Sequence, residues 1–261
     1  MPVPPLAEPV SYPDLAGKVA VVTGGSRGIG AATALALALN GAAVAVVGRD
    51  RKALDAVVGT ITGCGGRAIG VAADCTDDAE LASLRQRVRD DLGRADILVP
   101  FAGGEGMPVP SGSETAEHWR RVVDSDLTST FLTISTFLPD LTTPRSGVVV
   151  TMSSAAARQA ARSSAAYAAA KAGVIALTRH LAGELAGEGL RINCVAPSAI
   201  ENDRMRASMP PAGLDQLGAS FPLGRIGQPV DVAAATLFLA SQASSWITGA
   251  TLDIAGGKVM V

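Results

Sequence analysis

The sequence of 261 residues has only three cysteines and no excess of positive charge. The cysteines, Cys64, Cys75 and Cys194, have neither metal-binding spacing nor a Cys-x-x-Cys pair, and their odd number argues against a disulfide framework. The formal net charge of -2 creates no overall positive field that would attract nucleic acid or an anionic membrane surface. We therefore expect no metal site, no nucleic-acid partner and a reducing, cytoplasmic setting.

Long apolar runs are also missing. None reaches the roughly 18 residues that a membrane-spanning helix requires, and the N-terminus has neither the basic start nor the apolar core of a signal peptide. We therefore expect no membrane partner and no secretion. Prolines are concentrated in the first residues, so we expect residues 1–17 to form an extended N-terminal segment and residues 18–261 a single domain.

Short β-branched runs alternate with longer stretches that are rich in alanine and leucine. The runs are continuously apolar, as expected of parallel strands that are covered on both faces. Strands are predicted at 18–23, 43–48, 68–72, 96–102, 147–152, 190–196 and 250–254. Helices are predicted near 29–40, 51–62, 77–92, 114–141, 163–187 and 230–242. This alternation predicts an α/β fold with one doubly wound, Rossmann-like parallel sheet and a ligand crevice at the carboxyl ends of its strands.

A glycine-rich segment, Thr23-Gly24-Gly25-Ser26-Arg27-Gly28-Ile29-Gly30, follows the first predicted strand and opens the first predicted helix. Glycine lets the backbone turn sharply and approach a pyrophosphate, which the helix N-terminus attracts through its N–H groups and dipole. The spacing differs from the common G-x-G-x-x-G pattern, and a turn without a ligand is the alternative. The position between a strand and a helix favours a dinucleotide phosphate site.

The end of the second strand bears on the choice of dinucleotide. A carboxylate there would bind the ribose hydroxyls of the adenosine and repel a 2′-phosphate. The register places Gly48 at this point, followed by Arg49, whose guanidinium suits phosphate, and Arg27 offers a second positive charge. We therefore expect NADP(H) in preference to NAD(H); the alternative is that Arg49 is solvated and Asp50 caps the next helix. Asp74, after the third strand, has two equal interpretations, an acceptor for the adenine amino group or a cap of the following turn.

Tyr167 and Lys171 are one helical turn apart, so both side chains project from one face. A tyrosine near its reference pKa of about 10 is a poor base at neutral pH, and a lysine ammonium one turn away favours the phenolate. Ser153 and Ser154 end the fifth strand, where a hydroxyl could stabilise charge that develops on a substrate oxygen. From these residues alone, an ordinary amphipathic helix and a turn-capping serine pair remain alternatives.

In this order, the motifs resemble those of the classical short-chain dehydrogenase/reductase family. The resemblance runs from about residue 18 to residue 257 and rests on Thr23–Gly30, Asp74, Ala102-Gly103, Ser154, Tyr167-x-x-x-Lys171, the segment from Asn193 to Pro197, and Gly256-Gly257. It implies a doubly wound domain, an NAD(P)(H) cofactor and a homo-oligomer, either a tetramer or a dimer. The expected reaction interconverts a moderately apolar ketone, with a 3-oxoacyl thioester as one candidate, and a secondary alcohol.

The resemblance also implies roles for individual residues. Ser154 would orient the substrate oxygen, Tyr167 would transfer the proton, and Lys171 would hold the nicotinamide ribose and promote ionisation of the tyrosine. The residues expected to bind the cofactor are Gly24, Ser26, Arg27, Gly28, Ile29, Gly30, Arg49, Asp74, Cys75, Ala102, Gly103, Tyr167, Lys171, Pro197 and Ile200.

Several positions depart from the family's pattern. Pro100-Phe101 replaces two amides, Ser198 replaces a glycine, Asn202 a threonine and Ala255 an aspartate. Most consequential is Asp126, which aligns with the family's catalytic asparagine, the residue that supports a water linked to the catalytic lysine. We expect Asp126 to be part of the catalytic group, to pair with Lys171 and to weaken its pull on Tyr167. The departures favour one alternative, a dinucleotide-binding regulatory protein with little or no turnover.

Segment 198–228 has no clear periodicity and carries several prolines and glycines. We predict that it forms a lid over the crevice. The expected pocket walls are residues 104–110, residues 155–159 and the lid residues Met205, Met209 and Phe221. Such a lining favours a moderately apolar ketone as substrate.

Overall fold

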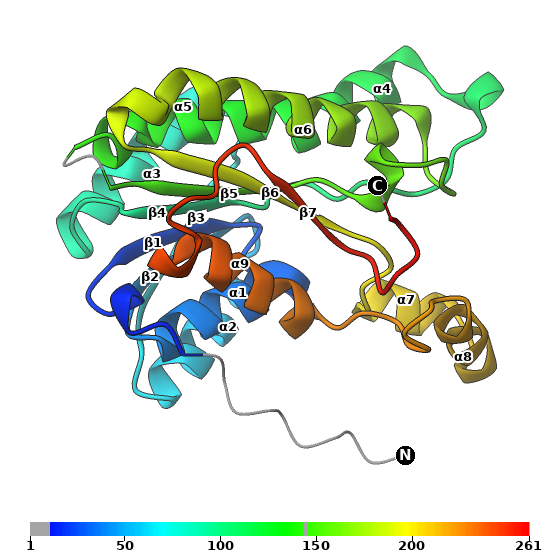
Figure 1. Cartoon of the computed structure of the whole chain (residues 1–261), viewed down its shortest axis with the longest axis horizontal. Coiled ribbons are helices and arrows are strands. Elements are labelled where there is room, and N and C mark those ends of the chain that lie inside the picture. Colours follow the sequence, from blue (N-terminus) through cyan, green and yellow to red (C-terminus); the bar gives the residue numbers. More distant parts are fainter. Residues whose placement is uncertain (1–10, 144–145, 261) are drawn as a thin grey trace.

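The computed structural model describes residues 11–143 and 146–260, in which seven parallel strands form one sheet (Figure 1). They are β1 (Val19–Thr23), β2 (Ala43–Gly48), β3 (Arg67–Ala72), β4 (Ile97–Pro100), β5 (Val148–Met152), β6 (Arg191–Pro197) and β7 (Thr251–Ile254). Their order across the sheet is β3-β2-β1-β4-β5-β6-β7. The chain therefore moves outward from β1 to β3 and then returns to the other side of β1. Such a reversal opens a crevice at the carboxyl ends of the strands.

Helices cover both faces of the sheet, which confirms the predicted doubly wound fold (Figure 1). On one face lie α1 (Gly28–Leu39), α2 (Arg51–Gly63) and α9 (Pro229–Ala240), and on the other lie α3 (Asp78–Asp91), α4 (Ala116–Val123), α5 (Ser129–Leu141) and α6 (Ala165–Leu185). No helix within residues 11–143 and 146–260 is long and apolar enough to cross a bilayer.

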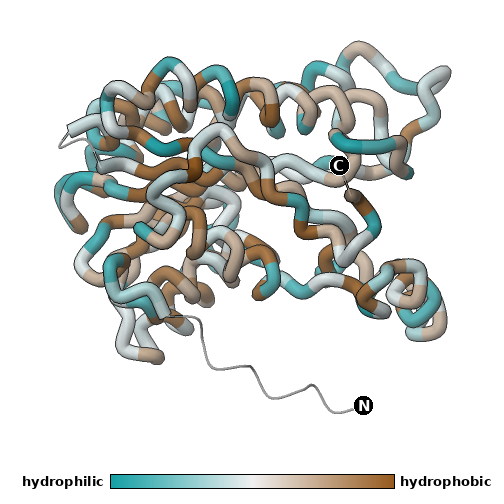
Figure 2. The backbone as a smooth tube through the Cα atoms, viewed as in Figure 1, coloured by the Kyte–Doolittle hydropathy of each residue, from teal (hydrophilic) through white to brown (hydrophobic). Residues whose placement is uncertain are grey.

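The core has two halves, because successive strand residues point to opposite faces of the sheet. Val22 of β1 packs with Leu37 of α1 in one half, whereas Val21 packs with Phe137 of α5 in the other. All five residues of β1 are buried. Figure 2 shows the hydrophobic colour concentrated along the strands between the helical layers. The continuously apolar strands are therefore the result of two-sided burial.

Three predicted elements differ from the structure. The helix predicted over 114–141 is interrupted by a π-helical turn at Asp124–Thr128, which separates α4 from α5. The fourth strand ends at Pro100 rather than at residue 102. The predicted lid contains two short helices, α7 (Asp203–Ser208) and α8 (Pro211–Ala219). Helices of six and nine residues are too short to establish a clear period of 3.6 residues in the sequence.

The predicted extension, residues 1–17, lies in part outside the described residues, which begin at residue 11. Residues Pro13–Leu15 form a 3-10 turn, and Leu15 is buried in the core. The backbone N–H of Tyr12 donates to Asn40 Oδ1 at 2.7 Å. This part of the segment therefore packs on the domain, and the boundary near residue 18 stays a prediction.

Asp140 anchors α3 to α5 from a buried position. Its side chain is 1% exposed and accepts hydrogen bonds from Arg85 Nε at 2.7 Å and Arg89 Nη1 at 3.0 Å. Replacing Asp140 with Asn removes the charge that both guanidinium groups share, so we expect the free energy of unfolding to fall by about 2 kcal/mol. Urea unfolding of the variant measures this loss. A change below about 0.5 kcal/mol would show that the ion pairs contribute little.

Candidate active site

The glycine-rich segment forms a tight cradle between β1 and α1. Gly24 has φ +63°, and a Cβ at this position would lie 2.5 Å from the carbonyl oxygen of Phe101. A Cβ at Gly30 would collide with the carbonyl oxygen of Gly24. Arg27, the N-cap of α1, makes no side-chain capping hydrogen bond, so the first-turn N–H groups are left for a ligand. The cradle therefore fits a pyrophosphate that approaches the backbone closely.

The end of β2 lies beside this cradle. A Cβ at Gly48 would be 3.2 Å from Ser26 Oγ, so no side chain separates the end of β2 from the glycine-rich segment. Asp50 Oδ1 accepts a hydrogen bond from the N–H of Ala53 at 3.1 Å, which confirms the alternative that Asp50 caps the next helix. Arg27 Nη2 pairs with Asp50 Oδ2 at 3.0 Å, but both side chains are exposed, and such pairs contribute at most about 1 kcal/mol. Arg49 is exposed and has no ion pair in the described part of the chain.

Asp74 caps the turn that follows β3, as one of its two interpretations predicted. Its Oδ1 accepts hydrogen bonds from the backbone N–H of Thr76 at 2.9 Å and from the Thr76 hydroxyl at 2.7 Å. These bonds, the backbone one first, lower the pKa of Asp74. Burial raises the pKa of the adjacent Cys75 thiol to about 11, so this side chain is a protonated core residue at neutral pH.

Asp126 occupies the π-helical turn and joins three elements. Its Oδ1 lies 2.9 Å from Lys171 Nζ and accepts the N–H of Gly104 at 2.8 Å, while Oδ2 accepts the hydroxyl of Ser125 at 2.8 Å. Its side chain is 0% exposed and that of Lys171 is 2% exposed. A Cβ at Gly103 would be 2.7 Å from Asp126 Oδ1, so the carboxylate needs glycine here. The predicted pairing of Asp126 with Lys171 is confirmed.

Lys171 is a buried cation directed at the tyrosine. Nζ lies 5.7 Å from the centre of the Tyr167 ring and also donates to the carbonyl oxygen of Met152 at 3.2 Å. Burial lowers the pKa of Lys171, but the negative charge of Asp126, with a smaller effect of Tyr167, outweighs it and leaves the pKa raised. The ammonium therefore keeps its proton through the neutral range.

The start of α6 fixes Tyr167 from two sides. The hydroxyl oxygen of Ser164, the N-cap, accepts the N–H of Tyr167 at 3.2 Å, and Glu114 Oε2 accepts the N–H of Ala165 at 3.1 Å. A Cβ at Gly106 would lie 3.1 Å from Tyr167 Cζ, so the loop after β4 runs against the tyrosine ring. Sequence reasoning missed Glu114, and it expected Gly106 in a pocket wall but not against the tyrosine ring. These contacts are between segments distant in the sequence and have no local motif.

The two serines after β5 have different surroundings. Ser153 is buried, and its hydroxyl donates to the carbonyl oxygen of Lys171 at 2.7 Å. Ser154 is partly exposed, and its Oγ accepts the N–H of Ala156 at 3.2 Å. Ser154 therefore caps a 3-10 turn, as the alternative of a turn-capping serine pair predicted. Its hydroxyl hydrogen donates to no acceptor among the residues that the structure describes. Of the two serines, only Ser154 can therefore donate its hydroxyl hydrogen to a ligand.

The segment after β6 reaches the same end of the sheet. The N–H of Ser198 donates to the carbonyl oxygen of Ile254 at 3.1 Å, and Ile200 forms a β-bridge with Gly227 at the base of the lid. Asn202 Oδ1 accepts the N–H of Met205 at 2.9 Å and so caps α7. Pro197 and Ile200 thus lie at the carboxyl end of β6, beside Ile254 and Gly227 respectively.

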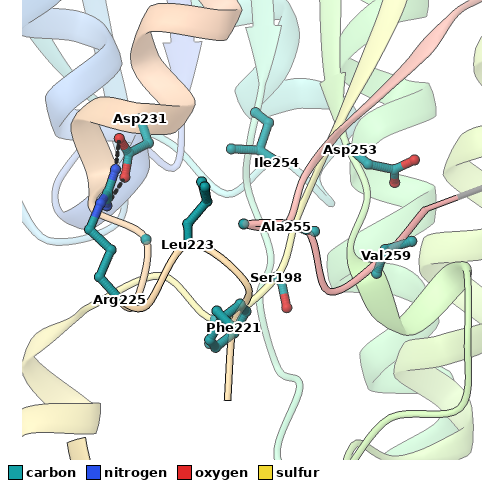
Figure 3. Close-up of a pocket in the computed structure, with 13 residues that line it drawn as sticks. Ser198, Phe221, Leu223, Arg225, Asp231, Asp253, Ile254, Ala255 and Val259 are labelled. Carbon is teal, nitrogen blue, oxygen red and sulfur yellow. Dashed lines mark hydrogen bonds and ion pairs between the residues drawn. The ribbon is translucent and has the colours of Figure 1, made fainter. Parts of the chain in front are cut away.

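A cavity of about 360 Å³ is lined by the residues that directly follow β6, by later residues of the predicted lid and by C-terminal residues. Figure 3 shows Phe221 and Leu223 of the lid facing Ile254 and Ala255, with the ion pair of Arg225 and Asp231 at one side. Ser154, Tyr167 and Lys171 do not line it. The cavity is therefore separate from the predicted catalytic residues. Across the described residues, no cluster of His, Cys, Asp and Glu could hold a metal ion.

Comparison with known proteins agrees with this geometry. A family model described as enoyl-(acyl carrier protein) reductase matches residues 24–258. The chain is 39% identical to cis-4-hydroxycyclohexanecarboxylate dehydrogenase of Sinomonas cyclohexanicum, over 94% of this chain and 98% of that protein. It is 38% identical to the 3-oxoacyl-[acyl-carrier-protein] reductase FabG of Chlamydia pneumoniae, over 93% and 97% of the two chains.

Among solved structures, the chain superposes with a TM-score of 0.89 on an NADPH-bound short chain oxidoreductase from Pseudomonas aeruginosa PAO1, described as containing an atypical catalytic center. The two are 34% identical, over 95% of this chain and 99% of that one. Levodione reductase gives a TM-score of 0.88 at 31% identity, over 93% and 98%. The chain therefore belongs to the short-chain dehydrogenase/reductase family, whose members use nicotinamide dinucleotides, and it is an oxidoreductase that acts on CH–OH groups.

Proposed function

We propose that this oxidoreductase uses NADP(H) to interconvert a moderately apolar ketone and a secondary alcohol, with Tyr167 as the acid/base. The observation that carries the proposal is the buried ammonium of Lys171, which lies 5.7 Å from the centre of the Tyr167 ring. Ser154 adds a hydroxyl whose hydrogen donates to no acceptor among the described residues. A buried cation at this distance favours a tyrosine that can give and take a proton.

In the reducing direction, Tyr167 donates its hydroxyl proton to the carbonyl oxygen, and in the oxidising direction it takes the proton back. Ser154 donates a hydrogen bond to the same oxygen and stabilises the charge that develops there. Lys171 stabilises the phenolate that remains, and Asp126 holds Lys171 in place at 2.9 Å. The nicotinamide dinucleotide, when bound, supplies or accepts the hydride.

We expect the cofactor residues predicted from the sequence to border the crevice at the carboxyl ends of the strands. The backbone of the glycine-rich segment would hold the pyrophosphate. Asp74 Oδ2 accepts no hydrogen bond from the described residues and would take the adenine amino group. Residues that would contact the remaining parts of the cofactor are Arg27, Arg49, Ala102, Gly103, Tyr167, Lys171, Pro197 and Ile200, whereas Cys75 would contribute its backbone, because its thiol is buried.

The preference for NADP(H) is supported by Arg49, which is exposed beside the cradle, and by the missing carboxylate at Gly48. We expect Arg49→Ala to raise the KM for NADPH by about tenfold or more, because a guanidinium–phosphate hydrogen bond contributes about 1.5–3 kcal/mol. The KM for NADH should stay unchanged. Initial-rate kinetics with both cofactors measure the ratio, and Arg87→Ala, an exposed arginine on α3, is the control. Equal effects on the two cofactors would contradict the assignment.

The substrate class is supported by the expected apolar walls and by the relatives, whose names give a hydroxycyclohexane carboxylate and a 3-oxoacyl thioester. The test is a panel of cyclic ketones, oxo acids and 3-oxoacyl thioesters incubated with NADPH and the purified protein. We expect consumption of NADPH to match formation of the alcohol. Tight binding of NADPH without turnover of any ketone would favour a regulatory dinucleotide-binding protein and overturn the proposal.

We also propose a homo-oligomer, a tetramer or a dimer, and a cytoplasmic location. Phe131 supports the assembly, because it is 46% exposed and lines an open hollow with Leu127 and Leu177, and contiguous exposed apolar surface is uncommon on monomers. Light scattering of the purified protein tests it. The location is supported by the cysteines, all three of which are free.

A further inference from the structure

Arg158 and Asp253 form an ion pair that joins two segments 95 positions apart in the chain. Arg158 Nε donates to Asp253 Oδ1 at 3.0 Å, and Nη2 donates to Oδ2 at 2.8 Å. The side chains are 22% and 16% exposed. A fork of two parallel hydrogen bonds fixes orientation as well as distance, so this pair holds its two segments in one arrangement.

One of the two segments carries Ser154. Arg158 ends the 3-10 turn Ala155–Ala157 that begins directly after this serine. The N–H of Ala157 donates to the carbonyl oxygen of Ser154 at 2.9 Å, and the N–H of Arg158 donates to that of Ala155 at 3.0 Å. The turn is therefore one hydrogen-bonded unit, and a displacement of Arg158 displaces Ser154.

The other segment is β7, which lies at the edge of the sheet. Its Asp253 is in register with Ala196 of β6, and the next residue, Ile254, is in register with Pro197. Pro197 begins the segment that we propose to contact the cofactor. The ion pair therefore connects the turn that carries Ser154 to β7. Through the neighbouring strand β6, it also connects this turn to the segment that we propose to contact the cofactor.

Besides the ion pair, Arg158 Nη2 donates to the carbonyl oxygen of Thr251 at 3.5 Å, and Ala157 of the Ser154 turn packs against the buried cluster of Val174, Ile175 and Cys194. The apolar contacts of this turn with the C-terminal segment form a cluster of only three buried residues, Ala155, Ala255 and Val259. Figure 3 shows Asp253, Ala255 and Val259 along one wall. Residues 159–162, which follow Arg158, are exposed, and the chain is buried again only at Ser164. Arg158 is thus the last anchor before an exposed stretch.

We propose that Arg158 and Asp253 are positioning residues that set the Ser154 hydroxyl relative to the Tyr167 hydroxyl, so that both reach one substrate oxygen. The inference rests on the proposed function, in which these two hydroxyls act together. A misplacement of about 1 Å in a reacting group lowers the rate by about a hundredfold. The pair therefore acts on turnover of the ketone and not on binding of the cofactor.

The test uses Asp253→Asn and Arg158→Met in the full-length enzyme. We expect kcat for the ketone to fall by about tenfold to a hundredfold, with the dissociation constant of NADPH changed by less than about twofold. The double variant Arg158→Met/Asp253→Leu should have a kcat no lower than that of the less active single variant, because the two residues act as a unit. Arg158→Lys keeps the charge but loses the fork, so an intermediate kcat is expected.

Asp140→Asn is the matched control, because it also breaks a buried arginine–aspartate pair, between α3 and α5. It should lower stability and leave kcat unchanged. The proposal is overturned if Arg158→Lys, Arg158→Met and Asp253→Asn all keep the wild-type kcat. It is equally overturned if Asp140→Asn lowers kcat as much as they do, since the role would then be structural.

Hydrogen exchange separates this inference from the proposed function. In Asp253→Asn, the amides of residues 154–158 should exchange faster than in the wild type, whether or not the enzyme turns over a ketone. Unchanged exchange there would overturn the positioning role even in an active enzyme. Absence of ketone turnover in the wild type, together with faster exchange in the variant, would instead overturn the proposed function and leave the anchoring of the Ser154 turn established.

Discussion

Tyr167→Phe is expected to lower kcat for ketone reduction by about a thousandfold, because it removes the group that we propose to transfer the proton. Phenylalanine keeps the ring, which lies so close to Gly106 that a Cβ at this glycine would be 3.1 Å from Cζ, so the contact with the loop after β4 is preserved. The N–H of residue 167 also keeps its bond to Ser164, since that bond belongs to the backbone. The variant should therefore fold and bind NADPH normally.

Steady-state kinetics give kcat, and quenching of protein fluorescence gives the dissociation constant of NADPH. Tyr12→Phe is the matched control: it changes the other tyrosine of the chain, which packs on the core near the N-terminus, and should leave kcat unchanged. A Tyr167→Phe enzyme with more than about a tenth of wild-type kcat would show that the proton comes from another group. A large loss of NADPH affinity would instead indicate a defect in the crevice itself.

Asp126→Asn is expected to move the pH dependence of alcohol oxidation to lower pH. The carboxylate of Asp126 lies 2.9 Å from Lys171 Nζ and offsets the positive charge that favours the tyrosine phenolate. Asparagine removes that negative charge while keeping an oxygen for the N–H of Gly104. We therefore expect the rising limb of kcat to lie at lower pH in the variant than in the wild type.

The profile of kcat against pH measures this shift. Asp124→Asn is the control, because Asp124 lies in the same π-helical turn, is exposed, and is bonded to Thr128 instead of Lys171. An unchanged limb, or a limb at higher pH, would contradict the electrostatic role of Asp126.

The same substitution should lower stability. Because the pKa of Lys171 is raised, its ion pair contributes fully to the free energy of unfolding at any pH below the ordinary lysine value of 10.5. This contribution is lost only as the pH rises through the folded-state pKa. Asparagine leaves the ammonium buried without a counter-charge, so unfolding in urea at neutral pH should require less denaturant. The wild-type enzyme should lose this difference only as the pH rises above the ordinary lysine value of 10.5.

The fold could be predicted because strands that are buried on both faces consist of consecutive apolar residues, which can be recognised in the local sequence. All five residues of β1 are apolar or small enough to be buried, and strands alternate with helices along the chain. The glycine-rich segment was equally readable, since a Cβ at Gly24 or Gly30 would collide with backbone. The lid helices were missed because a six-residue helix such as α7 contains fewer than two turns.

The candidate site was only partly readable. Tyr167 and Lys171 share one helix, so their spacing alone places them together. Asp126 was expected beside Lys171 only because the family resemblance aligned it there. The π-helical turn that carries it was not foreseen, and neither was the contact of Gly103 with its carboxylate.

The sequence by itself determined the doubly wound fold, the phosphate cradle and the tyrosine–lysine pair, because each depends on residues within a few positions of one another. Tertiary structure alone decided that Glu114 holds the start of α6, that Ser153 is buried whereas Ser154 is partly exposed, and that Arg158 meets Asp253. These contacts join segments tens of residues apart. Their partners are chosen by how the strands are ordered and packed, which leaves no period or motif in either segment.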